Sequence, residues 1–191
     1  MISNYRSISI LTLFSKIFEK VIQTRLLKHL TDHNILSKEQ YGFRTKQKTD
    51  NATYQWTNEI VNALNNHLLI GWIFCDLEKA FDCVNHKILL SKLDFYGITG
   101  YHYKLCKSYL TNRYQRTLLY NKTWATIKHG VPQGSVLGLL LFLIFINNLP
   151  KFVTDKSVPI LTADDTSILL FHSNPTDFNN NISSVFKILS D

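Results

Sequence analysis

Two long segments near the start of the chain place hydrophobic residues at helical spacing. The segment from 12 to 30 carries polar residues on its opposite side, and a second segment from about 50 to 69 repeats the pattern. Residues three and four apart share one face of a helix, so both segments predict amphipathic helices. The apolar positions are Phe14, Ile17, Phe18, Val21, Ile22 and Leu26, opposite Lys16, Glu19, Lys20 and Gln23, and in the second segment Trp56, Ile60, Ala63 and Leu64.

Shorter apolar runs predict strands that end at acidic residues. Gly71 interrupts the second helical pattern, and residues 72–75 then read as a buried strand that ends at Asp76. Residues 160–163 and 167–171 read as two strands on either side of Asp164-Asp165-Thr166. This pattern predicts a hairpin with two acids at its tip.

Helices and strands are mixed along the chain without a regular βαβ alternation, which predicts an α+β fold. The apolar run 136–146 is shorter than the roughly 20 residues that a membrane-spanning helix needs, so we expect a buried core helix. The other expected elements are a helix from Asn85 to Gly97, a short helix over about 103–110, and a hairpin of 115–120 and 123–128 around Asn121-Lys122.

Composition and charge limit the classes of protein to which this chain can belong. With 45% hydrophobic and 13% aromatic residues in 191 positions, the chain can bury a sizeable core, and this composition argues against disorder. A net charge of +7 fits a nucleic-acid partner or a basic protein with no special partner. The three cysteines include no C-x-x-C pair, which argues against a disulfide framework or a zinc site and favours reduced thiols in an intracellular protein.

Asp76, Asp164 and Asp165 are candidate catalytic residues because each follows an apolar strand. A carboxylate at the end of a buried strand is costly unless it is paired or binds a metal. Taken singly, the acids also fit a solvated turn and a helix cap. Taken together, carboxylates on separate rigid elements are what a pair of Mg²⁺ ions requires, because Mg²⁺ prefers hard oxygen ligands.

Five segments, in order, resemble the motifs of one known family. Residues 74–86, FCDLEKAFDCVNH, closely resemble the first catalytic motif of non-LTR retrotransposon reverse transcriptases, especially LINE elements of the jockey type. The order and spacing of the motifs match over essentially the whole chain. The other segments are Asn4-Tyr5-Arg6 with residues 15–20 for the fingers motif, residues 40–44 for the next, 130–138 for the second palm motif and 163–166 for the third.

The resemblance implies a right-hand polymerase with fingers over about 1–70 and a palm over about 71–191, the palm carrying a fingers-side insertion and an antiparallel sheet backed by helices. It implies a nucleotidyltransferase, an RNA-directed DNA polymerase of a transposable element, working on an RNA template, a DNA primer and dNTPs, with no membrane role. Asp76 and Asp164 would hold two Mg²⁺ ions, for which Mn²⁺ could substitute. Asp165 and the Leu77 carbonyl would assist them. We expect the protein in the nucleus, the cytoplasm or both.

The resemblance also implies roles in substrate binding. Phe81 would be an aromatic steric gate against the ribose 2′-hydroxyl, with an ordinary core aromatic as its alternative. Arg6 would grip the triphosphate, and Gln133 with Gly134 would meet the incoming nucleotide. The residues expected along the template path are Arg44, Lys46, Arg113 and Arg116, of which Lys46 and Arg113 also fit surface cations.

The family's fingers begin before Asn4, and its later palm motifs, primer grip and thumb follow Asp191. We therefore expect the 191-residue chain, which lacks the thumb, to polymerise poorly or not at all by itself and to leave apolar surface exposed on the helix over 12–30. Two other functions compete: an inactive nucleic-acid-binding remnant, and an RNA-directed RNA polymerase. Phe81 argues against the latter, because RNA polymerases leave room for the 2′-hydroxyl.

Overall fold

The chain forms two compact units, each built from two separate stretches of sequence. The computed structural model describes residues 8–44, 47–116, 124–153 and 157–190. Residues 1–36 and 79–146 form the first unit, called here the helical unit, and residues 37–78 and 147–191 form the second, the sheet unit. This division differs from the predicted boundary near residue 70. It does not test which residues are fingers and which are palm, so that assignment stays a prediction.

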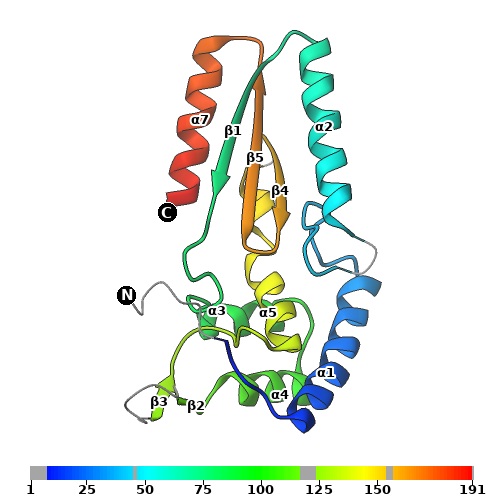
Figure 1. Ribbon diagram of the computed structural model, residues 1–191, viewed down its shortest axis with the longest axis vertical. Coiled ribbons are helices and arrows are strands. Elements are labelled where there is room, and N and C mark those ends of the chain that lie inside the picture. Colours follow the sequence, from blue (N-terminus) through cyan, green and yellow to red (C-terminus); the bar gives the residue numbers. More distant parts are fainter. Residues whose placement is uncertain (1–7, 45–46, 117–123, 154–156, 191) are drawn as a thin grey trace. The chain divides into compact units, whose positions relative to one another are not determined.

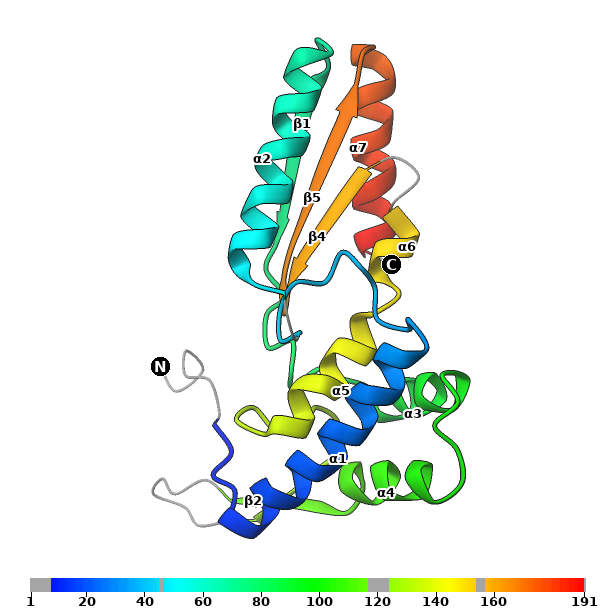
Figure 2. The same ribbon diagram turned by 90° about the vertical axis from the view of Figure 1, so that its right-hand side faces the viewer.

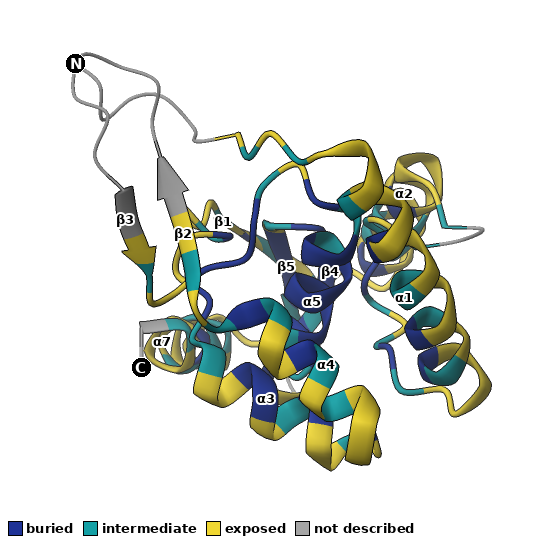
Figure 3. Ribbon diagram, turned by 90° about the horizontal axis from the view of Figure 1, so that it is seen from below, coloured by how far each residue is buried: buried dark blue, intermediate teal, exposed yellow. Residues whose placement is uncertain are grey.

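The helical unit is built around α5 (Val136–Ile146), the apolar helix that the sequence predicts as a core element. Both α1 and α3 pack against α5, and α4 packs against α3. Most side chains of α5 are buried, as its dark blue ribbon shows in Figure 3. The remaining elements of the unit are α1 (Leu13–Asp32), α3 (His86–Phe95), α4 (Gly100–Leu110), β2 (Arg113–Arg116) and β3 (Trp124–Ile127).

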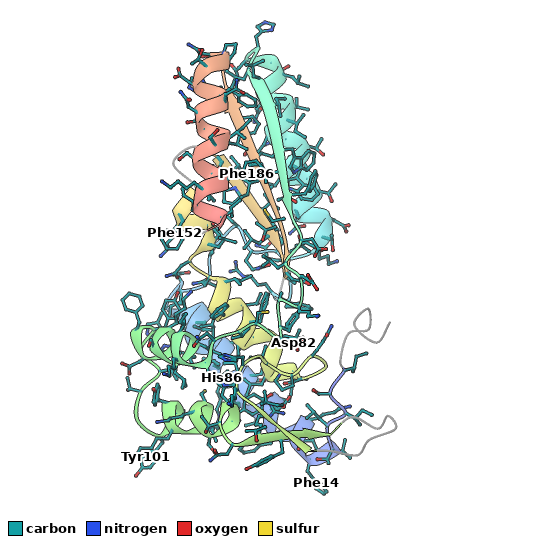
Figure 4. The ribbon with its side chains drawn as sticks, turned by 90° about the vertical axis from the view of Figure 1, so that its left-hand side faces the viewer. Phe14, Asp82, His86, Tyr101, Phe152 and Phe186 are labelled. Atoms are coloured by element: carbon teal, nitrogen blue, oxygen red, sulfur yellow. The ribbon has the colours of Figure 1, made fainter. Side chains whose placement is uncertain are left out.

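The helix predicted over residues 12–30 is confirmed, and of its predicted apolar positions Leu26 is buried whereas Phe14 and Phe18 are exposed. The buried residues of α1 are Glu19, Leu26 and Leu30. Phe14 is 84% exposed and projects away from the ribbon in Figure 4. The apolar side chains of the first half of α1 are therefore largely exposed, as expected for this segment. The burial of Glu19 has a specific cause in the polar contacts described below.

The sheet unit contains a three-stranded antiparallel sheet in the order β1-β5-β4. Its strands are β1 (Leu69–Cys75), β4 (Ser157–Thr162) and β5 (Asp165–His172). Helices α2 (Thr49–Asn65) and α7 (Pro175–Ser190) lie on either side of the strands in Figures 1 and 2. This mixture of helices and antiparallel strands confirms the predicted α+β class.

Side-chain alternation along β5 explains why the sheet has a helix on each face. Ile168 and Leu170 pack with Val185 of α7, whereas Leu169, between them in sequence, packs with Ala52 of α2. Successive side chains of a strand point to opposite faces of its sheet. A strand buried on both faces therefore reads as a continuous apolar run, as this one does.

Several predicted boundaries are corrected by packing. The helix expected to reach residue 69 ends at Asn65, and β1 begins at Leu69, so Gly71 lies inside a strand rather than before it. A Cβ at Gly71 would come within 2.6 Å of the Phe178 ring of α7. The glycine therefore accommodates a helix that the sequence pattern did not predict. A second unpredicted helix is α6 (Leu149–Val153).

The hairpin of β2 and β3 is confirmed over the described residues. Arg113 pairs with Ile127 and Arg116 with Trp124, so β2 begins two residues before the predicted strand. The predicted turn at Asn121-Lys122 lies outside the described residues.

The segment Val136–Val153 is the one helical segment of the described residues that is long and apolar enough to cross a membrane. Its mean hydropathy is 2.0 over 18 residues, and 56% of that window is buried. This segment joins α5 to α6, whereas the predicted run 136–146 is the 11-residue α5 itself. The burial of α5 against α1 and α3 nevertheless supports a core helix.

Candidate active site

The three predicted catalytic acids lie at one end of the sheet. Thr162 pairs with Asp165, so the hairpin turn between β4 and β5 consists of Ala163 and Asp164. On the other side of β5, Cys75 pairs with Thr166 and is followed by Asp76. The β1–β5 register thus brings Asp76 to the same sheet end as Asp165. The hairpin is confirmed, although Asp165 and Thr166 belong to β5 rather than to the turn.

The carboxylates at this end are available to a cation. Asp164 is half-buried, while Asp76 and Asp165 are exposed. Among the described residues, none of the three carboxylates accepts a hydrogen bond or forms an ion pair. Unpartnered carboxylates supply the oxygen ligands that Mg²⁺ prefers. Because Asp164 is half-buried, a bound cation would offset the cost of removing its carboxylate from water.

Within the described residues, no group of three or more acidic, histidine or cysteine side chains is assembled tightly enough to enclose a metal ion. Mg²⁺ commonly binds through one or two carboxylates and completes its shell with water and substrate phosphates. The acids at the sheet end fit that kind of open site by donor type and placement. A closed cage built only from protein side chains is not formed by these residues.

The hairpin turn is held by the loop that precedes α2. Gln40 is 3% exposed, and its Oε1 accepts hydrogen bonds from the backbone N–H groups of Ala163 at 3.1 Å and Gly42 at 2.7 Å. Its Nε2 donates to the Ala163 carbonyl at 3.5 Å. Ala163 has a φ of 63°, a left-handed conformation that costs a non-glycine residue about 1–2 kcal/mol. The surrounding contacts must stabilise it.

Arg44 closes the same loop. Its Nη1 donates to the Ser37 carbonyl at 2.5 Å and to the Gln40 carbonyl at 3.4 Å. Burial lowers the pKa of the Arg44 guanidinium, and the nearby Glu39 opposes that effect. One nitrogen of the Arg44 guanidinium therefore stabilises the loop between Ser37 and Arg44. The predicted contact of Arg44 with the template stays a prediction.

In the helical unit, the second half of the first catalytic motif is hydrogen-bonded to the start of the second palm motif. Val131 N–H donates to the Phe81 carbonyl, and Gly130 N–H donates to the Val84 carbonyl, both at 2.8 Å. His86 Nε2 lies 2.7 Å from the Gly130 carbonyl, which makes this histidine a structural link. A Cβ at Gly130 would come within 2.9 Å of the Asp82 backbone, and its φ is +88°, so glycine is required there.

Phe81, the predicted steric gate, is packed inside the helical unit. Its side chain is 8% exposed, and its ring centroid lies 4.4 Å from that of Phe142. This packing is what the core-aromatic alternative expects. The gate role stays a prediction.

Gln133 and Gly134 lie on a loop beside Ser9. Ser9 N–H donates to the Gln133 carbonyl at 2.9 Å, and a Cβ at Gly134 would lie 3.2 Å from the Ser9 carbonyl oxygen. The Gln133 side chain is half-buried and lines a small hollow of about 30 Å³ together with Asp82 and Arg113. The loop is therefore closely packed, and its predicted nucleotide contact stays a prediction.

Glu19 is the buried polar centre of the helical unit, at 3% exposure. Its carboxylate accepts hydrogen bonds from the hydroxyls of Tyr109 at 2.9 Å and Ser135 at 2.7 Å, and from the Val136 N–H at 3.1 Å. Ser135 also caps α5, because its Oγ accepts from the Gly138 N–H at 2.8 Å. Glu19 therefore fixes the start of α5, directly after Gln133 and Gly134.

The other predicted basic residues are only partly described. Arg113 lies with its guanidinium carbon 4.9 Å from the centroid of the Tyr109 ring, a cation–π contact within the helical unit. The side chain of Arg116 and all of Arg6 and Lys46 lie outside the described residues. Their predicted roles stay predictions.

Comparison with known proteins decides the family. Residues 2–191 match the family model described as reverse transcriptase (RNA-dependent DNA polymerase). The chain belongs to the reverse transcriptase family. It is 34% identical over 178 residues to a probable RNA-directed DNA polymerase from transposon BS of Drosophila melanogaster, a match that covers 90% of this chain and 20% of that protein.

The mobile element jockey of Drosophila melanogaster encodes a second relative among reverse transcriptases. Its RNA-directed DNA polymerase is 33% identical over 176 residues, which cover 88% of this chain and 19% of the relative. The predicted resemblance to jockey-type elements is thus confirmed. The chain spans about a fifth of the length of these relatives.

Solved telomerase structures share the fold. Telomerase from Candida albicans, solved with a fragment of telomeric RNA, superposes with a TM-score of 0.61 at 13% identity, covering 93% of this chain and 32% of that one. Apo telomerase from Candida tropicalis gives a TM-score of 0.60 at 14% identity, with 91% and 37% covered. The fold is consistent with the predicted fingers and palm of a reverse transcriptase.

Sequence reasoning recognised the motifs that contain Glu19 and Gln40 but assigned no role to either side chain. Both residues look like surface positions, since Glu19 falls on the polar side of its predicted helix and Gln40 directly follows Lys38 and Glu39. The signal that could have suggested otherwise was their place inside segments that match the family.

Proposed function

We propose that this chain carries the polymerase centre of an RNA-directed DNA polymerase encoded by a non-LTR retrotransposon. It would join a deoxynucleotide to the 3′-hydroxyl of a DNA primer on an RNA template, in the nucleus, the cytoplasm or both. The observation that carries the proposal is the position of Asp76, Asp164 and Asp165. Among the described residues these acids have no hydrogen-bond or ion-pair partner, and they lie at one end of the sheet in a chain of the reverse transcriptase family.

Asp76 and Asp164 would hold two Mg²⁺ ions, with Asp165 and the Leu77 carbonyl as further oxygen donors and Mn²⁺ as a substitute. When bound, Mg²⁺ supplies the positive charge that activates the primer hydroxyl and neutralises the leaving pyrophosphate. The protein's own contribution is to keep the carboxylates on rigid elements, because small misplacements in this geometry are costly. The sheet does so, because Asp76 directly follows β1, Asp165 begins β5, and Asp164 lies in the two-residue turn between β4 and β5.

Other residues would select and orient the substrates. Arg6 would bind the triphosphate through its fork of N–H donors, and Gln133 with Gly134 would meet the incoming nucleotide. Phe81 would exclude the ribose 2′-hydroxyl. Arg44 and Arg116, within a chain of net charge +7, would attract the phosphates of the template, whose binding should weaken steeply with added salt.

Primer extension on the purified 191-residue chain tests the proposal, with an RNA template and either Mg²⁺ or Mn²⁺. We expect short, weak extension that disappears in Asp164→Asn but persists in Asp177→Asn, a matched change of an exposed acid in α7 of the same unit. Extension that survives Asp164→Asn would refute the assigned site. Tight binding of primer–template with no extension in either metal, by a longer version that includes the thumb, would favour the inactive remnant.

A further inference from the structure

Two backbone hydrogen bonds join the loop before α2 to β4, the strand that leads into the hairpin turn. Tyr41 N–H donates to the Leu161 carbonyl and Leu161 N–H donates to the Glu39 carbonyl, both at 2.8 Å, so Gln40 and Leu161 form a parallel bridge. These bonds lie on either side of Gln40 and direct its side chain at a fixed point of β4. The backbone alone therefore sets the register of the loop against the hairpin.

The carboxamide of Gln40 then engages both polar groups of a single turn residue. Its Oε1 faces two N–H donors, those of Ala163 and Gly42, and its Nε2 faces the Ala163 carbonyl. Two donors meeting one atom identify that atom as the oxygen, which fixes the orientation of the amide. A side chain with only donors or only acceptors could not satisfy both groups of Ala163.

The backbone conformation of Ala163 sets the direction in which the chain continues into Asp164 and Asp165. It precedes Asp164 in the two-residue turn, and its φ of 63° is one that L-residues rarely adopt. Buried at 6% exposure, its N–H and carbonyl need partners, which Gln40 supplies. Gly42 leaves no alternative space, because a Cβ there would overlap the Ala163 nitrogen and lie 2.9 Å from the Thr162 carbonyl carbon.

We propose that Gln40 is a positioning residue of the polymerase centre, which holds the Ala163-Asp164 turn so that the Asp164 and Asp165 carboxylates bind a divalent cation. The inference rests on the proposed function and extends it to a residue that contacts neither the ion nor the substrates. Gln40 acts through the Ala163 peptide groups. Its loss should therefore weaken cation binding without removing any ligand.

The test uses the 191-residue chain with Gln40→Met, which keeps the length of the side chain but removes both hydrogen-bonding ends. Hydrogen exchange followed by NMR should show the Ala163 amide exchanging about tenfold faster, while the Leu169 amide in the middle of β5 keeps its wild-type rate. Binding of Mn²⁺, measured by electron paramagnetic resonance, should weaken about tenfold, as expected when the support of a metal ligand is lost.

Two further variants keep the result interpretable. Gln55→Met is the matched control, because Gln55 lies in α2 of the same unit and its Nε2 donates to Glu59 at 2.7 Å, away from the hairpin turn. It should leave exchange at Ala163 and Mn²⁺ binding unchanged. Gln40→Asn retains the carboxamide but is one methylene shorter, so it cannot reach both groups of Ala163 and should act like Gln40→Met.

The outcomes separate the inference from the proposed function. Mn²⁺ binding that is lost in Asp164→Asn but unchanged in both Gln40 variants overturns the positioning role and leaves the proposed function standing. Mn²⁺ binding that survives Asp164→Asn overturns the proposed function and the positioning role with it. Loss of the circular dichroism spectrum of the fold in both Gln40 variants would make Gln40 a general folding residue and overturn the specific role.

Discussion

In the helical unit, the carboxylate of Glu19 meets the first turn of α5, whereas in the sheet unit the carboxamide of Gln40 meets the turn between β4 and β5. Both side chains are 3% exposed, and each holds a segment next to predicted site residues. They differ in what they face. A helix start presents only N–H donors and the positive end of the helix dipole, which favour a carboxylate.

The turn held by Gln40 presents one donor and one acceptor from the same residue, Ala163. A carboxamide matches that pair because it supplies one acceptor and one donor. A carboxylate would place an oxygen acceptor against the Ala163 carbonyl oxygen, which is also an acceptor. The chemical type of each buried side chain thus follows from the backbone groups it must satisfy. Changes at these positions should therefore affect the two units separately.

Glu19→Ala should have the largest effect. It removes the acceptor shared by the Tyr109 and Ser135 hydroxyls and the Val136 N–H, and the loss of these buried, charge-assisted hydrogen bonds should lower the free energy of unfolding by about 3–5 kcal/mol. Hydrogen exchange measured by mass spectrometry should rise in the α5 peptides and stay constant in β4 and β5. Equal increases in both units would show that the units do not respond independently.

Phe81→Ala should follow, with a loss of about 3 kcal/mol, because it removes a ring that packs 4.4 Å from that of Phe142. Urea unfolding measures this loss. The milder Phe81→Val tests the gate role in a version of the enzyme that extends primers, where a relaxed gate should raise incorporation of ribonucleotides. If stability falls while nucleotide selection stays at the wild-type level, Phe81 is a core residue only.

Gly42→Ala probes the sheet unit in the same way. Its new methyl group would overlap the Ala163 backbone, and such overpacking should cost about 2 kcal/mol. Peptides from β4 and β5 should exchange faster, and α5 peptides should not. Gly100→Ala is the control for added bulk, since a Cβ at Gly100 meets nothing within 4 Å, although its φ of +60° still adds backbone strain. An equal response in α5 would contradict the separation of the units.

The smallest expected effect is a dependence on alkaline pH in the helical unit. Burial, opposed by the hydrogen bond with Ser135 and aided by the nearby Glu19, raises the pKa of Tyr109 to about 12. The folded state therefore favours the neutral phenol. The resulting contribution to the free energy of unfolding is complete below pH 10, the ordinary pKa of tyrosine. It is lost as the pH rises from 10 to about 12.

Because Tyr109 is partly exposed, the loss should be about 1 kcal/mol after solvent screening. Tyr109→Phe should remove this part of the decline in the free energy of unfolding, measured by urea titration at each pH. The exposed Tyr101, shown projecting outward in Figure 4, offers a matched control in Tyr101→Phe, which should keep the decline. The same alkaline decline in Tyr109→Phe and the wild type would contradict this origin.

Local sequence patterns were sufficient to predict the elements whose structure depends on their own residues. The continuous apolar composition of α5 allows only burial, and its core position was predicted. The acids of the β4–β5 hairpin follow an apolar strand directly, so their place at the hairpin end was predicted as well. The motifs around Asp76 and Asp164 also indicated the family, because their residue types and spacing are local properties of the chain.

Tertiary structure alone decided the features that depend on partners distant in sequence. Glu19 is buried because α5 begins 117 positions later with an uncapped N–H at Val136, and Gln40 is buried because Ala163, 123 positions later, needs a donor and an acceptor. Gly71 lies in a strand because it pairs with Leu170, and its lack of a side chain leaves room for the Phe178 ring. Periodicity records which residues share a face, but a polar residue becomes buried only when a distant backbone group satisfies it.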